Sequence, residues 1–153
     1  MEGAHDSIMN KTIWDFQQTV SQRLLRLNIV NIGLGVVLAL FGKGVSRGIG
    51  TQAVGWGLIN VAIAVFGSRG TRSRYDKMEN PLDPAIRARE ARNLRLILLV
   101  NTVLDVFYML GGRWLAQNRG KEDERMRGTG YGIILQGALL FVFDLIHAFQ
   151  VRK

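Results

Sequence analysis

RMRGTGYGIILQGALLFVFDLIH, residues 125–147, is the stretch of this sequence that decides the fold. After Arg127 it is apolar enough to cross a membrane, yet it contains one acid, Asp144, and one histidine, His147. At about 100° per residue, Gln136, Asp144 and His147 fall on one stripe of a helix. We therefore predict a membrane-crossing helix with one polar face, whose carboxylate needs partners on other helices.

The rest of the chain repeats this alternation of apolar blocks and charged connectors. Its 153 residues are 48% hydrophobic and carry a formal net charge of +8, without any cysteine. We expect two segments: a tail and amphipathic interfacial helix over residues 1–23, and a four-span membrane domain over residues 24–153. The spans are predicted at residues 24–43, 48–68, 94–113 and 128–150. This makes an all-α, four-helix transmembrane bundle.

The connections give further local predictions. The amphipathic helix either lies at the membrane interface, with Trp14 as its anchor, or runs straight on into the first span. Asp83 and Pro84 are typical of a helix start, with Asp as the N-cap and Pro at the first helical position. The glycines of the second span favour close helix contacts.

Lys and Arg residues are distributed unequally over the two sides of the predicted membrane domain. The side that holds both termini and the long connector carries nearly twice as many as the other. This bias predicts cytoplasmic termini in a cell inner membrane or plasma membrane. Basic loops on both sides can contact anionic lipid headgroups. We do not expect nucleic-acid binding, because the basic residues flank apolar segments instead of alternating with aromatic ones.

The two halves of the chain resemble each other as two tandem helical hairpins. Offsets of 70 residues for the first helix of each hairpin and 84 for the second superimpose polar residues of the same kind. The pairs are Asn31 with Asn101, Gln52 with Gln136, and Asn60 with Asp144. Chance matches between apolar helices are common, so duplication and coincidence both stay open at this point.

Polar residues inside the predicted spans define the candidate site. We expect them to face one another across the bundle as a polar seam. The set comprises Asn31, Asn60, Asn101, Asp105, Tyr108, Gln136, Asp144 and His147. Two interpretations stay open: a ligand or proton site, and interhelical hydrogen bonds that only hold the bundle.

Several chemistries lack a matching pattern. Asp105, Asp144 and His147 would be a ligand-poor metal site, and a single membrane histidine is a weak haem ligand, so neither metal nor cofactor is expected. The glycines from Gly128 to Gly132 lack the spacing and the preceding strand of a phosphate loop. No nucleophile lies in a pattern with a base. We expect a protein that is not an enzyme.

Three clusters of the sequence carry a resemblance to a known family. They are Gly55-Trp-Gly-Leu-Ile-Asn60, Asn101 with Leu104-Asp-Val106, and Gln136-Gly-Ala138 with Phe143-Asp144. They resemble an uncharacterised family of small bacterial four-helix integral membrane proteins, known as a domain of unknown function. The resemblance covers roughly residues 28–149. It implies four spans and no particular activity.

Three functions are compatible with these patterns. The first is a multi-pass membrane protein whose polar seam holds the bundle and binds a small ligand or lipid headgroup. The second is a small proton-coupled or solute transporter that uses Asp105 and Asp144. The third is an accessory subunit of a larger complex, for which a partner would cover small-residue faces such as those of Ala53 and Gly57. A homo-oligomer is compatible with all three.

Overall fold

The computed structural model describes residues 12–151, and their regular structure is entirely helical. The four helices are α1 (Ile13–Phe41), α2 (Gly44–Lys77), α3 (Pro84–Asn118) and α4 (Glu124–Gln150). Each is long and apolar enough to cross a membrane. The predicted all-α four-helix bundle is confirmed. The predictions for the tail and for the beginning of the N-terminal amphipathic helix, residues 1–11, lie outside the described residues.

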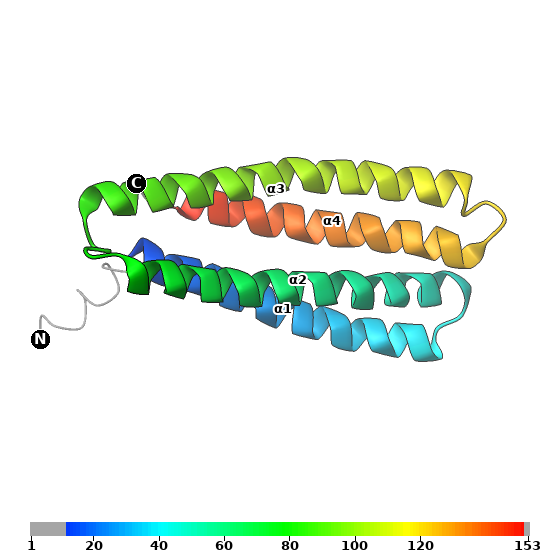
Figure 1. The fold of residues 1–153 in the computed structure, drawn as a ribbon. Helices are drawn as coiled ribbons and strands as arrows, with labels where there is room; N and C mark the ends of the chain where they lie inside the picture. Colours follow the sequence, from blue (N-terminus) through cyan, green and yellow to red (C-terminus); the bar gives the residue numbers. More distant parts are fainter. Residues whose placement is uncertain (1–11, 152–153) are drawn as a thin grey trace, which may run out of the picture.

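The helices form two antiparallel hairpins that lie side by side (Figure 1). α1 packs along α2, α3 packs along α4, and α2 joins the hairpins by packing against α4, while α1 and α3 contact each other only weakly. We call the end that holds both chain termini and the α2–α3 connector the terminal end. The opposite end, with the two short turns inside the hairpins, is the hairpin end.

Short polar residues fix where three of the helices begin. Thr12 and Asp15 form a capping box at α1, in which the Asp15 amide donates to Thr12 Oγ1 (3.3 Å) and the Thr12 amide donates to Asp15 Oδ2 (3.1 Å). Asp83 accepts from the amides that follow Pro84, which confirms the predicted start of α3. Asp123 caps α4 in the same way. In the turn before α2, Gly44 has a φ of +49°, a conformation that favours glycine.

The bundle is apolar on its outside and lined by small and polar residues on its inside. Five of the eleven buried apolar residues are alanines, among them Ala53, Ala64 and Ala148, while Phe41, at 79% exposure, and many other large side chains face outward. A chain in water would bury its large apolar side chains first. Small residues between helices and large ones outside are the arrangement that suits a lipid surrounding.

Trp14, in the N-terminal part of α1, does not lie where the sequence predicted. Residues 13–41 form one continuous helix, so the amphipathic segment runs directly into the apolar one. Trp14 is 4% exposed, and its Nε1 donates to Pro81 O at 2.8 Å, with Tyr75 packed edge-on against its ring. It is therefore not an interfacial anchor. The bundle extends past the apolar segments at the terminal end, and this extension buries the indole.

Candidate functional site

Amide side chains link α1 to α2 and to α4. Asn31 and Gln136 bond reciprocally: Asn31 Nδ2 donates to Gln136 Oε1 (3.0 Å), and Gln136 Nε2 donates to Asn31 Oδ1 (2.9 Å). Asn60 Nδ2 donates to Asn28 Oδ1 (3.1 Å), and Asn28 in turn donates to Leu24 O. These four amides bond to one another and, through the Nδ2 atoms of Asn28 and Asn31, to backbone carbonyls. This part of the predicted seam can hold the helices together by itself.

Carboxyl groups gather instead between α3 and α4. Asp105 is 3% exposed and Asp144 is 8% exposed, and Asn101 lies beside Asp144. Asp105 Oδ2 is buried and has no hydrogen-bond partner among residues 12–151. A buried acceptor without a partner is costly. The two carboxyl groups are therefore the part of the seam whose bonding is incomplete within the chain.

His147 lies apart from the carboxyl groups. Its Nε2 is 3.2 Å from Arg23 Nη1, and its Nδ1 is 2.6 Å from Phe143 O. Because the guanidinium and the carbonyl fix one donor and one acceptor, Nδ1 carries the proton and Nε2 accepts. His147 thus ties α4 to α1 and does not pair with Asp144.

Tyr108 lies on the outer surface. It is 43% exposed, and its ring packs edge-on against Trp56 with centroids 4.9 Å apart. Its helical spacing from Asp105 predicted that Tyr108 belongs to the polar stripe of α3. This stripe covers a wider part of the helix surface than the interface that α3 shares with α4. Tyr108 therefore stands at the edge of this stripe, next to α2.

A buried polar network at the terminal end was not among the features predicted from the sequence. Gln17 Nε2 donates to Glu90 Oε2 (3.1 Å), Thr71 Oγ1 donates to Gln17 Oε1 (2.8 Å), and Arg74 Nη2 reaches both Gln17 Oε1 (3.0 Å) and Glu90 Oε2 (3.3 Å). It joins α1, α2 and α3. One signal was available, because Glu90 is the only acid between Asp83 and Asp105 and stands in an otherwise basic stretch.

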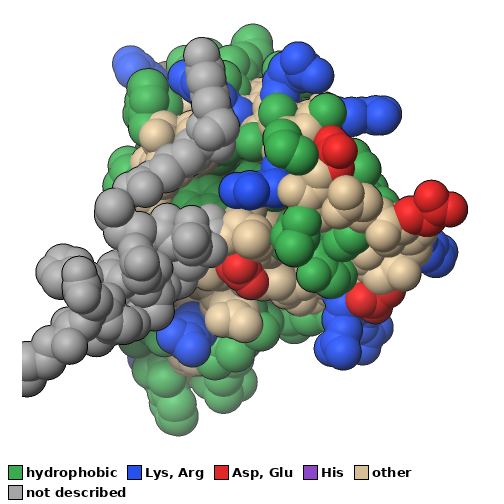
Figure 2. Space-filling view, turned by 90° about the vertical axis from the view of Figure 1, so that its left-hand side faces the viewer, with side chains coloured by type: hydrophobic (Ala, Val, Ile, Leu, Met, Phe, Trp, Pro, Cys, Tyr) green, Lys and Arg blue, Asp and Glu red, His purple; other side chains and the backbone are tan. Residues whose placement is uncertain are grey.

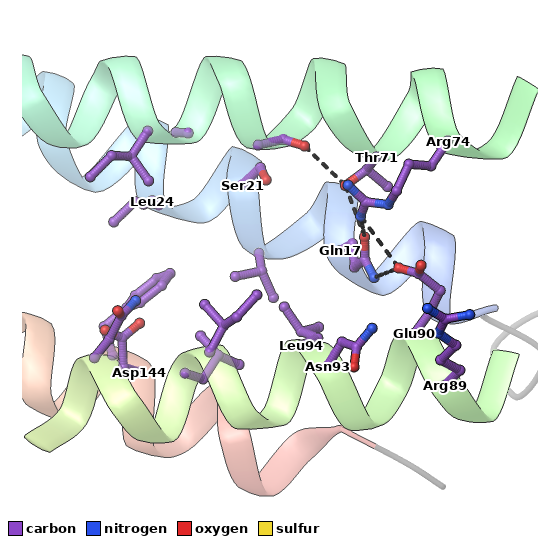
Figure 3. Close-up of a pocket in the computed structure, with 18 of the residues that line it drawn as sticks. Gln17, Ser21, Leu24, Thr71, Arg74, Arg89, Glu90, Asn93, Leu94 and Asp144 are labelled. Atoms are coloured by element: carbon purple, nitrogen blue, oxygen red, sulfur yellow. Dashed lines mark hydrogen bonds and ion pairs between the residues drawn. The ribbon is translucent and has the colours of Figure 1, made fainter. Parts of the chain in front are cut away.

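A cavity of about 730 Å³ runs from this network to Asp144. Figure 3 shows Gln17, Arg74 and Glu90 at one end and Asp144 at the other, with α2 and α3 on opposite sides. Its walls between the two ends are mainly apolar, with contributions from Val20, Leu24, Ile63, Ala64, Leu94, Ile97, Leu98 and Phe143. The volume is that of a small-molecule pocket. The cavity is thus amphipathic, with charged groups at its terminal end.

The hairpin end is closed by backbone contacts between glycines. A Cβ on Gly48 would overlap the backbone of Arg125 and Thr129, and one on Gly128 would overlap Val45. Between α3 and α4, a Cβ on Gly112 would lie 2.7 Å from Gly130 O. Helices this close leave no room for side chains between them. The cavity accordingly belongs to the terminal half of the bundle.

Equivalent contacts recur in the two hairpins. A Cβ on Gly35 would lie 2.9 Å from Ala53 Cβ. With the offsets of 70 and 84 residues, Gly35 and Ala53 of the first hairpin correspond to Asp105 and Gly137 of the second. A Cβ on Gly137 would lie 3.1 Å from Asp105 O. The structure therefore places the two hairpins' helices in matching registers. Asp105 takes the position of a glycine, which is why the carboxyl pair exists in only one hairpin.

No group of three or more His, Cys, Asp or Glu side chains is placed to hold a metal ion within residues 12–151. Comparison with known proteins finds no match among curated proteins and none among solved structures. The profile of a family of unknown function matches residues 23–145. This range takes in α2 and α3, most of α1 and α4, and every predicted site residue except His147. By this match, the chain belongs to the family of unknown function DUF6992.

Proposed function

We propose that this chain is a non-enzymatic integral membrane protein whose amide seam holds two hairpins together and whose cavity binds the headgroup of an anionic lipid. The bundle's apolar exterior supports the membrane location. Leu40 and Phe66 are both 69% exposed, and Phe149 is 71% exposed. Exposed apolar side chains at this density would make a protein in water aggregate.

The amphipathic cavity is the observation that carries the lipid proposal. Its apolar walls fit an acyl chain, and its charged end lies where the helices extend beyond their apolar segments. A lipid inserted from the bilayer would place its chain against Ile63 and Ile97 and its headgroup beside Arg89 and Asn93. All four residues line the cavity.

The charges at this end favour an anionic headgroup. Arg74 is engaged by Glu90 and Gln17, so its charge is largely compensated. Arg89 also lines the cavity and makes no ion pair among the described residues. An unpaired guanidinium beside an apolar channel suits a phosphate group.

The proposed orientation places the terminal end in the cytoplasm, in a cell inner membrane or plasma membrane. Figure 2 looks at this end, where Lys and Arg side chains stand around the rim with fewer Asp and Glu among them. The excess of basic residues follows the positive-inside rule. It also matches the anionic surface of a cytoplasmic leaflet.

The test compares two neighbouring arginines of α3. The detergent-purified protein is titrated with phosphatidylglycerol or phosphatidylcholine, and the melting temperature is measured for wild type, Arg89→Gln and Arg87→Gln. Arg87 is exposed and does not line the cavity. We expect phosphatidylglycerol to raise the melting temperature more than phosphatidylcholine does in wild type and Arg87→Gln, and the difference to disappear in Arg89→Gln. An equal response to both lipids would contradict the proposal.

A second candidate function is a proton-coupled or solute carrier, which the unpartnered Asp105 Oδ2 favours. A carrier would lose uptake into proteoliposomes in Asp105→Asn and Asp144→Asn while both variants remain folded. The accessory-subunit hypothesis loses its structural argument, because Ala53 and Gly57 are covered within the chain itself. A Cβ on Gly57 would meet Ile32 of α1, and Ala53 is 5% exposed.

A further inference from the structure

We propose that Asp105, Asp144 and Asn101 form a binding site for a single positive charge, a proton or an alkali cation, and that this site is reached from the terminal end of the bundle only. The site goes beyond the proposed lipid function and does not depend on it. A headgroup would occupy the outer end of the cavity, whereas this site lies at its inner end.

The carboxyl pair lacks a counter-charge within the chain. Neither Asp105 nor Asp144 forms an ion pair with a Lys, Arg or His side chain among residues 12–151. Asn101 is the polar neighbour of Asp144, and Asp105 Oδ2 has no hydrogen-bond partner in the same range. Two carboxyl groups side by side in an apolar surrounding need positive charge to compensate them. Carboxylate oxygens are also the ligand type that hard cations accept.

The cavity provides the route to Asp144, one member of the pair. Asp144 and Asn101 line its inner end. Glu90 lies eleven positions before Asn101 on α3, so the two ends are roughly 16 Å apart along the helix. Ser21 lines the cavity between the ends and offers a polar contact along this path.

Among the described residues that line the cavity, no other charged side chain lies at the inner end. The charged side chains that line the cavity from α2 and α3, Arg74, Arg89 and Glu90, all lie at its terminal end. The nearest titratable neighbour on α4 is His147, and it is engaged by Arg23 of α1. A positive charge at the carboxyl pair therefore has to come from solution.

Among the described residues, side-chain and backbone contacts close the interior toward the other end of the bundle. Toward the hairpin end, Asn31 and Gln136 bond across the interior. Beyond them, the glycine contacts Gly48 with Arg125 and Gly112 with Gly130 bring the helix backbones together. Access from one side only follows from these two features.

The test measures how fast a water-soluble carbodiimide modifies each carboxyl group of the detergent-purified protein. The reagent adds to a protonated carboxyl, and peptide mass spectrometry assigns the product to a residue. Gly67→Phe places a ring in the cavity, because a Cβ there has only Ser21 Oγ nearby, at 3.6 Å. Gly55→Phe is the matched control, because a Cβ on Gly55 meets nothing within 4 Å. The exposed Glu122 reports reagent activity in each sample.

We expect modification at Asp144 or Asp105 that is absent from the corresponding Asn variant. Gly67→Phe should slow it several-fold, and Gly55→Phe should leave it unchanged. Protection by sodium chloride but not by choline chloride at constant pH would identify an alkali cation as the occupant. Because the reagent needs a protonated carboxyl, every carboxyl reacts more slowly as the pH rises. A rate that sodium does not change, and that persists to higher pH than the rate at Glu122, would identify the proton. The proposal is overturned if neither aspartate reacts while Glu122 does, or if Gly67→Phe reacts as fast as wild type.

Discussion

Asn31 of α1 and Gln136 of α4 exchange two hydrogen bonds, of 3.0 and 2.9 Å, between their side-chain amides. Each amide uses one donor and one acceptor on the other. Asn31 Nδ2 also donates to Ala53 O at 3.2 Å, so the pair touches α2 as well. Gln136 is 3% exposed, so its bonds are shielded from water. This pair links the first hairpin to the second across the middle of the bundle.

Replacing one member of this amide pair should cost more than replacing both. Gln136→Leu leaves Asn31 with an unmatched donor and acceptor, and we expect a loss of about 1–3 kcal/mol in unfolding free energy. The double variant Asn31→Leu/Gln136→Leu should lose less stability than the two single variants together. This difference, the coupling energy of the pair, should be about 0.6 kcal/mol or more. Unfolding in mixed detergent micelles measures both quantities. Gln52→Leu is the control, since Gln52 has the equivalent place in the first hairpin and makes no side-chain hydrogen bond among the described residues. Equal losses in Gln52→Leu and Gln136→Leu would contradict this role of the pair.

Glu90 should be important for the stability of the terminal end of the bundle. Its Oε2 accepts from Gln17 and Arg74, so one carboxylate joins three helices. Glu90→Ala leaves Gln17 Nε2 without its acceptor beside a cavity, while Arg74 keeps only its bond to Gln17 Oε1, and we expect a loss of about 1–3 kcal/mol. Because Arg74 is about half exposed, its ion pair contributes only a small part of this cost. Glu79→Ala, at an exposed position of the connector, should change stability by less than about 0.5 kcal/mol. Similar melting temperatures for the two variants would show that the network is not important for stability.

The sequence predicts those features of this fold that depend on local pattern. The apolar blocks gave four helices, and Asp83 before Pro84 gave the start of α3. Gln136, Asp144 and His147 are all buried on α4, as the helical spacing indicated. Such features depend on residues within one or two helical turns, and a single sequence contains them completely.

Partners across helices were harder to predict, because rotation and register between helices are set by packing. His147 and Asp144 share one stripe of α4, but the partner of His147 Nε2 is Arg23, which lies 124 positions earlier in the chain. Tyr108 faces outward although it shares a helical stripe with Asp105. The network around Glu90 joins residues up to 73 positions apart, and no periodicity within one helix shows it.

Two adjacent glycines of α3 should respond oppositely to alanine. A Cβ on Gly112 would lie 2.7 Å from Gly130 O and 2.9 Å from Ile133 Cγ2, whereas a Cβ on Gly111 meets nothing within 4 Å. Gly112→Ala forces α3 and α4 apart, and we expect a loss of about 1–3 kcal/mol. Gly111→Ala should be neutral or raise stability by up to about 1 kcal/mol, since alanine is the better helix former. Thermal unfolding of both variants in the same detergent gives the comparison. A destabilised Gly111→Ala would mean that this face is covered in the assembled protein.

The proposed orientation can be tested without background, because the chain contains no cysteine. Glu79→Cys places a thiol in the α2–α3 connector at the terminal end, and Glu122→Cys places one in the α3–α4 turn at the hairpin end. Both positions are exposed. With cytoplasmic termini, a membrane-impermeable maleimide should label Glu122→Cys in spheroplasts and Glu79→Cys only after lysis. The reverse pattern would invert the orientation and put the mouth of the cavity on the outer side. Labelling of both variants before lysis would contradict a membrane-spanning bundle, because helices that cross the bilayer keep their two ends in different compartments.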